Sequence, residues 1–394
     1  MSKVLKVAIT GGPCGGKTTS LQLIANTFRE KGYKVYTISE TATDLINSGV
    51  KPYGDDKIAI TDFQDYIFMN QVNKENLYDE IAEKDDKDVI IICDRGILDN
   101  RAYLTDEQFE QILEKHNMTE AEIIPKYDLV VHLVTCANGK PEEYSNGNNK
   151  ARTETLIEAI KKDKDTQDSW ASHPNFRIIG NETGFNEKME RVLNLIRGAL
   201  GQNEIVRKEK YTVKEIDFSK LYNVHMIKQE IEEFVTRYSD TEDEMYRKTT
   251  INGDSYYTCP YIKKIPETGE YVKIYRKITE EEYYEALKCL PIEPIRNTRY
   301  SFVYDNESYK LDVYSNPDEL VTIEQEIIKG GHEKIPPFIS VGKKITDDDN
   351  YKYSNMFEKL IEKEKNEDKS KGKSLLKEFF PFKSSKKNIE RDDD

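Results

Sequence analysis

The pattern of apolar and polar positions changes near the middle of this chain of 394 residues. In the first half, continuous apolar runs alternate with longer segments of helical periodicity, and such runs are typical of parallel strands that are buried on both faces. Strands that alternate with helices predict βαβ units, so we expect a doubly wound parallel sheet of the α/β class. The strands are expected at residues 4–10, 34–39, 88–93, 128–134 and 176–179, and the longer helices at 17–31, 62–84 and 186–200.

After Gly201 apolar and polar residues alternate over short segments, and turn sequences such as Asn252-Gly253 separate these segments. This pattern predicts a mainly β part, an antiparallel barrel or sandwich, which one helix at 279–289 interrupts. The strands are expected at residues 204–213, 226–236, 243–250, 254–265, 270–277, 296–305, 308–314 and 320–328.

Tyrosine usage marks the same boundary. Of the 25 tyrosines, 17 lie in residues 201–357 and only eight lie before them. From about residue 358 the chain is rich in lysine and glutamate and poor in core-forming residues, which predicts a frayed helix followed by a disordered tail. We therefore expect one domain over residues 1–201, a second over 202–357 and a tail over 358–394.

A glycine-rich segment follows the first predicted strand and precedes the first predicted helix. It fits the phosphate-loop pattern G-x-x-x-x-G-K-[ST], and its residues are Gly11, Gly12, Pro13, Cys14, Gly15, Gly16, Lys17, Thr18 and Thr19. Backbone N–H groups of such a loop converge on phosphate oxygens, and the helix dipole adds to the attraction. We expect Lys17 to reach the β- and γ-phosphates and the Thr18 hydroxyl to bind Mg²⁺, with ATP or GTP as the nucleotide.

Three further residues are candidates for the chemistry of this site. Asp94 ends the 88–93 strand, where a carboxylate can hold Mg²⁺ beside the loop or can cap a helix. Glu40 follows the second strand and is either a general base toward a hydroxyl or a helix cap. Arg152 lies in a candidate lid, where it would stabilise charge in phosphoryl transfer unless it only faces solvent.

Composition limits the classes of function. The chain has 73 acidic and 59 basic side chains, a formal net charge of −14. Duplex nucleic acid needs a basic face, so we do not expect it as a partner. The five cysteines are odd in number and form no CxxC pair, which favours a reducing compartment, and no apolar run reaches the ~20 residues of a membrane span. We expect a cytoplasmic protein.

The tail differs from the rest of the chain in charge. Residues 369–388 contain seven lysines and one glutamate, with aromatic residues among them. Such a segment can lie on an anionic membrane, so peripheral membrane contact and a solvated disordered tail both remain open.

The second half resembles a known domain. Leu311-Asp312-Val313, followed by Thr322-Ile-Glu324-Gln-Glu326, resembles the late part of a CYTH, or triphosphate tunnel, domain. Glu204-Ile-Val-Arg-Lys208 resembles its opening E-x-E-x-K strand, with Val206 in place of the middle glutamate. A phosphate loop followed by a CYTH-like domain resembles the family of the fly TRPL translocation defect protein. The resemblance implies an antiparallel tunnel barrel that binds phosphorylated ligands.

Elementary geometry points to the same kind of site. Glu324 and Glu326 lie two apart on one strand and therefore share a face, where they can hold a divalent cation together with Glu204 and Asp312. An inward ring of cations would make a polyanion site, and its candidates are Lys208, Arg247, Lys263, Arg276, Arg296, Arg299 and Lys310. The alternative is an ordinary sheet with a charged, solvated face. Val206 removes one carboxylate of the metal set, which favours ligand binding over hydrolysis.

The two halves together predict Mg²⁺-dependent binding and hydrolysis of a nucleoside triphosphate, coupled to a second ligand. That ligand would be a phosphorylated small molecule, polyphosphate or an anionic phospholipid headgroup. GTP is favoured over ATP only by the resemblance, because the chain has no N-K-x-D motif. Two alternatives remain: a nucleoside-type small-molecule kinase with Glu40 as its base, and a triphosphatase whose tunnel performs the reaction.

Overall fold

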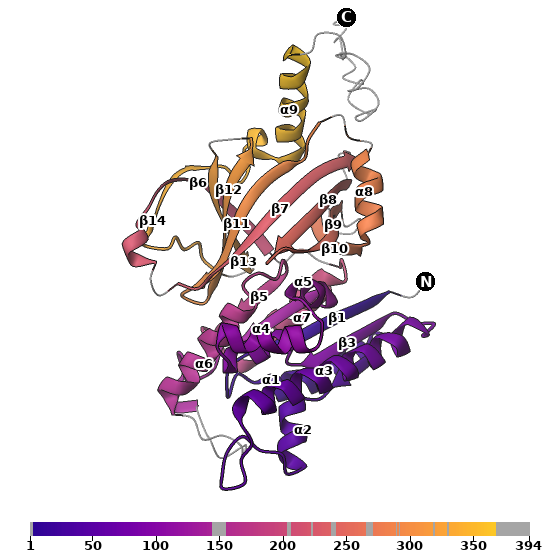
Figure 1. Ribbon diagram of the computed structural model, residues 1–394, viewed down its shortest axis with the longest axis vertical. Coiled ribbons are helices and arrows are strands. Elements are labelled where there is room, and N and C mark those ends of the chain that lie inside the picture. The colour runs from indigo at the N-terminus through magenta and orange to yellow at the C-terminus, as the bar shows by residue number, and fades with distance from the viewer. Residues whose placement is uncertain are drawn as a thin grey trace, which may run out of the picture.

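The computed structural model describes residues 3–143, 155–202, 206–221, 224–237, 242–264, 271–288, 290, 292–317, 320–328 and 331–367. Two sheets lie one above the other along the long axis of the molecule (Figure 1). Arg152, Glu204 and the 369–388 segment lie outside the described residues. No helix within the described part is long and apolar enough to cross a membrane.

The first sheet is parallel and has five strands in the order β2-β3-β1-β4-β5. Every residue of β3 and β4 is buried, as expected for strands that are covered on both faces. The predicted parallel sheet is therefore confirmed. Its strands are β1 Val4–Thr10, β2 Lys34–Ile38, β3 Val89–Asp94, β4 Leu129–Leu133 and β5 Phe176–Ile179.

Helices cover both faces of this sheet. Helices α1 (Lys17–Glu30) and α7 (Phe185–Ala199) share one core with Val7 and Ile92 of the strands. The opposite core contains Ala8, Phe68 and Trp170. The remaining helical segments of this part are α2 Thr41–Asn47, α3 Ile60–Glu83, η1 Ile97–Tyr103, α4 Asp106–Lys115, α5 Glu120–Ile123, η2 Ile124–Lys126, η3 Pro141–Glu143 and α6 Leu156–Ser169.

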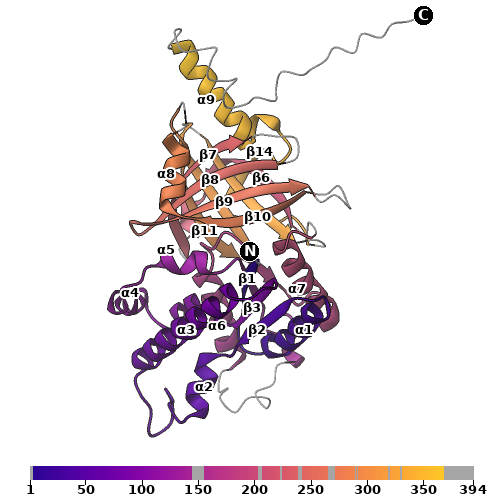
Figure 2. The same cartoon turned by 90° about the vertical axis from the view of Figure 1, so that its right-hand side faces the viewer.

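The second sheet is antiparallel and has nine strands in the order β10-β9-β8-β7-β11-β12-β13-β6-β14. It is strongly curved (Figures 1 and 2). The described residues of its edge strands β10 and β14 do not pair with each other, so the predicted closed barrel is not seen. Short β14 pairs with β6 through two register irregularities, which leaves little regular edge for closure. The strands are β6 Val206–Ile216, β7 Met226–Arg237, β8 Glu242–Ile251, β9 Asp254–Lys264, β10 Tyr271–Ile278, β11 Ile295–Tyr304, β12 Glu307–Asn316, β13 Val321–Ile328 and β14 Ile339–Lys344.

The two faces of the antiparallel sheet differ in character. Apolar residues of one face, among them Phe234, Tyr257 and Cys259, share a core with Tyr283 of helix α8 (Glu280–Lys288), and helix α9 (Tyr353–Glu367) joins the same core through Met356 and Phe357. The segments η4 Phe218–Lys220 and η5 Asp349–Tyr351 lie in the connections. Cross-strand register gathers charged and amide side chains on the other face. We call this second face the polar face, and its members include Lys208, Lys210, Gln229, Glu233, Arg247, Arg299, Lys310, Asp312, Glu324 and Glu326.

The two sheets share a hydrophobic core. Ile227, Tyr256 and Val303 of the antiparallel sheet pack in the same cluster as Trp170 and Ile124 of the phosphate-loop part. Figure 2 shows the antiparallel sheet resting on α5 and α7. A continuous core resists independent movement of the two parts. We therefore expect a conformational change in one part to alter the other.

Candidate functional site

The phosphate loop is shaped by glycines that tolerate no side chain. Gly11 has φ +142° and Gly16 has φ +90°, values that favour glycine. A Cβ on Gly11 would lie 2.2 Å from the carbonyl oxygen of Leu133, and a Cβ on Gly15 would lie 2.5 Å from the same atom. The loop therefore packs directly against the carboxyl end of β4, and its backbone is available for phosphate oxygens at the start of α1.

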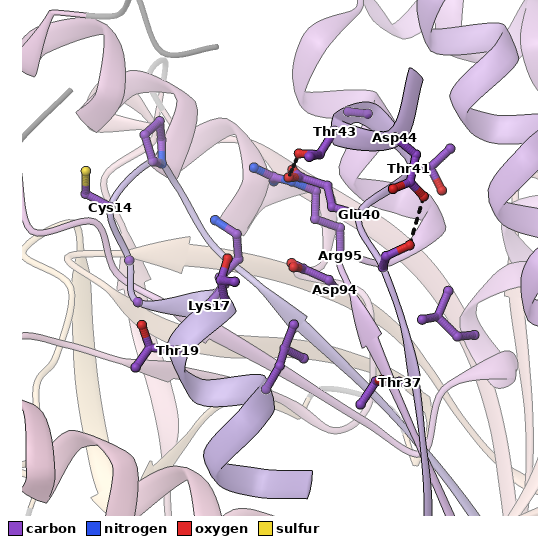
Figure 3. Close-up of a pocket in the computed structure, with 18 of the residues that line it drawn as sticks. Cys14, Lys17, Thr19, Thr37, Glu40, Thr41, Thr43, Asp44, Asp94 and Arg95 are labelled. Carbon is purple, nitrogen blue, oxygen red and sulfur yellow. Dashed lines mark hydrogen bonds and ion pairs between the residues drawn. The ribbon is translucent and has the colours of Figure 1, made fainter. Parts of the chain in front are cut away.

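Lys17 points from the start of α1 into the centre of the site (Figure 3). Its Nζ donates hydrogen bonds to the carbonyl oxygens of Gly11 at 2.8 Å and Gly12 at 2.9 Å. Burial, with a smaller contribution from the nearby Arg95, lowers the pKa of Lys17 to about 8 despite the acidic neighbours. A phosphate group beside Lys17 would offset this lowering, since a negative charge stabilises the ammonium form.

Glu40 occupies the N-cap position of α2, but its side chain does not cap the helix. Its carboxylate instead accepts a hydrogen bond from Nε of Arg95 and one from the Thr43 hydroxyl at 2.6 Å. Burial alone would raise the pKa of Glu40, but Arg95 and Lys17 outweigh it and lower the pKa to about 2. Glu40 is therefore a carboxylate at neutral pH, aimed at the same space as Lys17.

Arg95 holds the acidic groups of the site together. Its φ of +71° is unusual for a residue with a side chain, and such strain is concentrated at functional sites. Its Nη1 lies 3.2 Å from Asp99 and 3.4 Å from the carbonyl oxygen of Gly11. Burial alone would lower the pKa of Arg95, but Tyr103, Glu40 and Asp99 raise it well above its ordinary value. Arg95 stays charged and links β3 to α2 and the phosphate loop.

Asp94 fits the role of a magnesium ligand. It is 8% exposed, and within the described part of the chain its Oδ1 has no hydrogen-bond partner. Burial raises the pKa of Asp94 to about 6, with a contribution from Glu40. Lys17 and Arg95 compensate this carboxylate only in part, so a divalent cation would stabilise it further. Thr18, exposed at the start of α1 and lining the same cavity, could offer its hydroxyl to the ion.

The cavity around these groups is large, with a volume of about 1360 Å³. A typical site for one small molecule has roughly 300–1,000 Å³. One part lies along the phosphate loop and reaches Lys140, Asn181 and Phe185. The other part lies beyond Glu40 and is lined by residues of α3 and the segment before it, which are Tyr53, Phe63, Gln64, Ile67 and Gln71. There is room for a nucleotide and for a second molecule.

No sequence pattern predicts two of the buried residues of this site. Asp163 of α6 accepts a hydrogen bond from the backbone N–H of Gly12 at 2.9 Å. Lys188 of α7 donates to the carbonyl oxygens of Val134 at 3.0 Å and Gly15 at 3.4 Å. Burial lowers the pKa of Lys188 to about 8. Both residues occur in polar helical stretches where no motif distinguishes them, and only the tertiary structure brings them to the loop.

The polar face brings together four of the seven predicted ligand-binding cations, namely Lys208, Arg247, Arg299 and Lys310. Arg276 and Arg296 lie on the opposite face, where they pair with Glu282 at 3.5 Å and Glu293 at 2.6 Å. The structure does not join these two to the others, because strand alternation turns them outward. Lys263 belongs to β9, and its side chain lies outside the described residues.

Three of the four carboxylates that the sequence assigns to a metal in the second domain are paired with cations, and the fourth, Glu204, lies outside the described residues. Asp312 accepts two hydrogen bonds from Arg299 at 2.7 and 2.9 Å. Glu324 and Glu326 lie 2.8 and 3.2 Å from Lys208. Among the described residues no three acidic, histidine or cysteine side chains gather as a metal site. The polar face is a network of ion pairs whose side chains, apart from the 38% exposed Lys208, are largely shielded from solvent, unlike a solvated charged face.

Comparison with known proteins gives a family match for the first part of the chain. Residues 6–188 match the model of the AAA domain, which is less than half of the chain and includes the phosphate loop, Glu40, Asp94 and Asp163. No curated protein matches. Among solved structures 202 chains match, one of them "The crystal structure of the hypothetical protein NE1496". It is 16% identical over 38% of this chain and 96% of its own, with a TM-score of 0.28. The family match indicates a P-loop NTPase-like, nucleotide-binding domain over residues 6–188.

Proposed function

We propose that the phosphate-loop domain binds a nucleoside triphosphate with Mg²⁺ and transfers its γ-phosphoryl group to a small molecule with a hydroxyl group. The observation that carries the proposal is the Glu40–Arg95 pair, which lies in one cavity with Lys17 and Asp94. Kinases need a carboxylate near the acceptor hydroxyl, a lysine at the phosphates and a carboxylate for Mg²⁺. The cavity supplies each of these from a different element of the fold.

The second part of the cavity supports a bound acceptor. Phe63, Ile67 and Tyr53 provide apolar surface, and the amides of Gln64 and Gln71 provide polar groups. Gln71 is fixed by hydrogen bonds from its Nε2 to Glu75 at 3.2 Å and to the carbonyl oxygen of Arg95 at 3.0 Å. Apolar walls with a few placed amides suit a flat, polar molecule. A nucleoside-type acceptor fits this chemistry.

In the proposed reaction the acceptor oxygen forms a bond to the γ-phosphorus while the bond from phosphorus to the β–γ bridging oxygen breaks. The nucleoside diphosphate leaves, and the hydroxyl proton passes to Glu40 or onward to water. Because the pKa of Glu40 is about 2, the carboxylate acts mainly by orienting the hydroxyl. Lys17 stabilises charge on the transferred group, and Mg²⁺ held by Asp94 and Thr18 would neutralise the β- and γ-oxygens.

We expect the nucleobase to stack on the ring of Phe185. This ring lies against Gly16, is partly exposed and lines the cavity next to Lys140 and Asn181. An exposed aromatic ring next to a phosphate loop can stack on any base. This arrangement supports either ATP or GTP as phosphoryl donor, and the experiment below compares the two nucleotides.

A second function is favoured by the polar face, which we propose binds a polyanion such as polyphosphate or the headgroup of an anionic phospholipid. Lys208, Lys210, Arg247, Arg299 and Lys310 share this face. Their carboxylate partners hold the cations in place, and an incoming phosphate would compete with those carboxylates. We also propose, on the same residues, that the second domain is CYTH-like and that this face could act as a triphosphatase.

The proposed kinase activity is tested by offering γ-labelled ATP and GTP with Mg²⁺ and a panel of nucleosides and sugars. We expect labelled product with at least one acceptor. Glu40→Gln should lower transfer by roughly 10²–10³-fold and leave nucleotide affinity near that of the wild type. Asp62→Asn, an exposed carboxylate of α3, is the matched control and should change neither. Phosphate release without product from any acceptor would favour hydrolysis, and unchanged transfer by Glu40→Gln would refute the role of Glu40.

A further inference from the structure

Helix α6 contacts the nucleotide site through one buried carboxylate. Asp163 is 2% exposed, and its Oδ1 accepts hydrogen bonds from the backbone N–H groups of Gly12 and Thr135, both at 2.9 Å. The ring nitrogen Nε2 of His132 lies 3.0 Å from the same oxygen. A Cβ on Gly12 would lie 2.6 Å from it. Asp163 therefore fixes the first turn of the phosphate loop to the end of β4.

Asp163 is charged although it is buried. Burial alone would raise its pKa, but His132 and the backbone N–H groups of Gly12 and Thr135 outweigh burial and lower the pKa below its usual value. A charged acceptor makes stronger hydrogen bonds than a neutral one. The position of the loop thus depends on this carboxylate staying where it is.

One helical turn later, α6 contacts the antiparallel sheet. Gln167 is buried, and its Nε2 donates to Oδ2 of Asp163 at 3.0 Å and to Oδ1 of Asn306 at 2.9 Å. Asn306 lies in the two-residue turn between β11 and β12, with φ +57°. Three side chains in sequence therefore join Gly12 of the phosphate loop to a turn of the second sheet.

The chain after α6 reinforces this connection. The carbonyl oxygen of Ser172 accepts a hydrogen bond from Gln229 at 3.1 Å. At the start of β5, Arg177 lies 2.6 Å from Glu326, which also lies 3.3 Å from Lys310. Residues 163–177 thus touch the phosphate loop at one end and the charges of the polar face at the other. A ligand that changes those ion pairs would act on the same segment.

We propose that Asp163 is a positioning residue for the phosphate loop, and that Gln167 and Asn306 make its position, and hence nucleotide affinity, depend on the antiparallel sheet. The inference rests on the proposed nucleotide-binding function. When Asn306 holds Gln167, and Gln167 holds Asp163, the N–H groups of the loop are oriented before phosphate arrives. A preorganised loop binds more tightly because less is ordered on binding. When the Asn306 contact is lost, Asp163 gains freedom and the loop must be ordered by the nucleotide.

The test compares two asparagines that lie with positive φ in two-residue turns of the antiparallel sheet. Asn306→Gly keeps a residue that accepts positive φ but removes the amide that meets Gln167. Asn252→Gly is the matched control, since Asn252 has φ +53° in the turn between β8 and β9, and no described contact joins it to α6. Affinities for Mg·ATP and Mg·GTP are measured by titration calorimetry on the full chain, with the melting temperature of each variant.

We expect Asn306→Gly to weaken nucleotide binding on the order of fivefold, as for a typical coupling between sites. Asn252→Gly should bind like the wild type, and both variants should melt at similar temperatures. Equal affinities of the two variants would overturn the inference while nucleotide binding by the wild type stands. Failure of the wild type to bind either nucleotide would instead overturn the proposed function, and this inference with it.

A second variant separates positioning from a loss of folding. Gln167→Met keeps the size of the side chain, and within the described residues Oε1 of Gln167 has no hydrogen-bond partner to lose. We expect it to weaken binding as much as Asn306→Gly does, and the double variant to show no further loss, because both changes break one chain of contacts. Losses that multiply in the double variant would show that the two residues act separately and would contradict the inference.

Discussion

Asp94 ends β3 with a buried carboxylate that its neighbours Lys17 and Arg95 compensate only in part, and this affects the stability of the fold. The pKa of Asp94 is about 6 in the folded state against a usual value of 3.8. The folded state therefore holds the proton more tightly, so the carboxyl favours folding at low pH and its contribution is lost as the pH rises from about 4 through 6.

We expect Asp94→Asn to raise the free energy of unfolding by about 2–3 kcal/mol at pH 7, from 1.36 kcal/mol per pKa unit. The gain should shrink toward zero near pH 4, where the wild-type carboxyl is also largely protonated in the folded state. Urea unfolding at the two pH values measures both, and Mg²⁺-dependent turnover of the variant should be lost. A variant less stable than the wild type at pH 7 would contradict this account of Asp94.

Phe185 carries a separate prediction about the base. If its ring stacks on the nucleobase, Phe185→Ala should weaken both ATP and GTP binding by roughly tenfold, because stacking contributes about 1–3 kcal/mol per base. Phe218→Ala, another exposed phenylalanine that lies in the antiparallel part, serves as control and should bind as the wild type does. Fluorescence titration measures the affinity of each variant for both nucleotides. Equal affinities of the two variants would show that Phe185 does not stack on the base.

Among the structural elements, β5 contributes a direct charge contact between the two sheets. Arg177 and Glu326 are both buried and lie 2.6 Å apart. Removing one partner of a buried pair leaves the other charge uncompensated, which typically costs about 3–5 kcal/mol. We expect Arg177→Gln to lower the free energy of unfolding by an amount in this range.

The control for Arg177 is a surface pair of similar length. Arg197 lies 2.7 Å from Glu190 on α7, with the glutamate half exposed. Exposed pairs contribute about 1 kcal/mol or less, so Arg197→Gln should change stability little. Both variants are compared by urea unfolding at pH 7. If Arg177→Gln unfolds at the same urea concentration as Arg197→Gln, the contact between β5 and the polar face does not stabilise the molecule.

Across the whole molecule, the sequence predicts the features that are determined by residues close to one another in the chain. The buried run at Val89–Asp94 and the glycines of the phosphate loop needed only nearby residues, and the antiparallel strands followed from alternation and turns. The contact of Asp163 with Gly12 spans 151 positions, so no local pattern reveals it. Alternation alone also did not decide the face of Arg276, for which the sequence predicts an inward position, because the register of the sheet decides this. The predicted closed barrel failed for the same reason, because closure requires pairing between the edge strands β10 and β14, which no local pattern predicts and the described part of the structure does not show.

One continuous core joins the phosphate-loop part to the antiparallel sheet, and we propose that phosphate chemistry occurs at the phosphate loop. The most direct measurement is phosphate release or transfer from Mg·ATP and Mg·GTP by the wild type, by Lys17→Ala and by the double variant Glu324→Gln/Glu326→Gln. We predict that Lys17→Ala abolishes the activity and that the double variant retains it. Full activity in Lys17→Ala, together with loss of activity in the double variant, would assign the chemistry to the polar face and contradict the account.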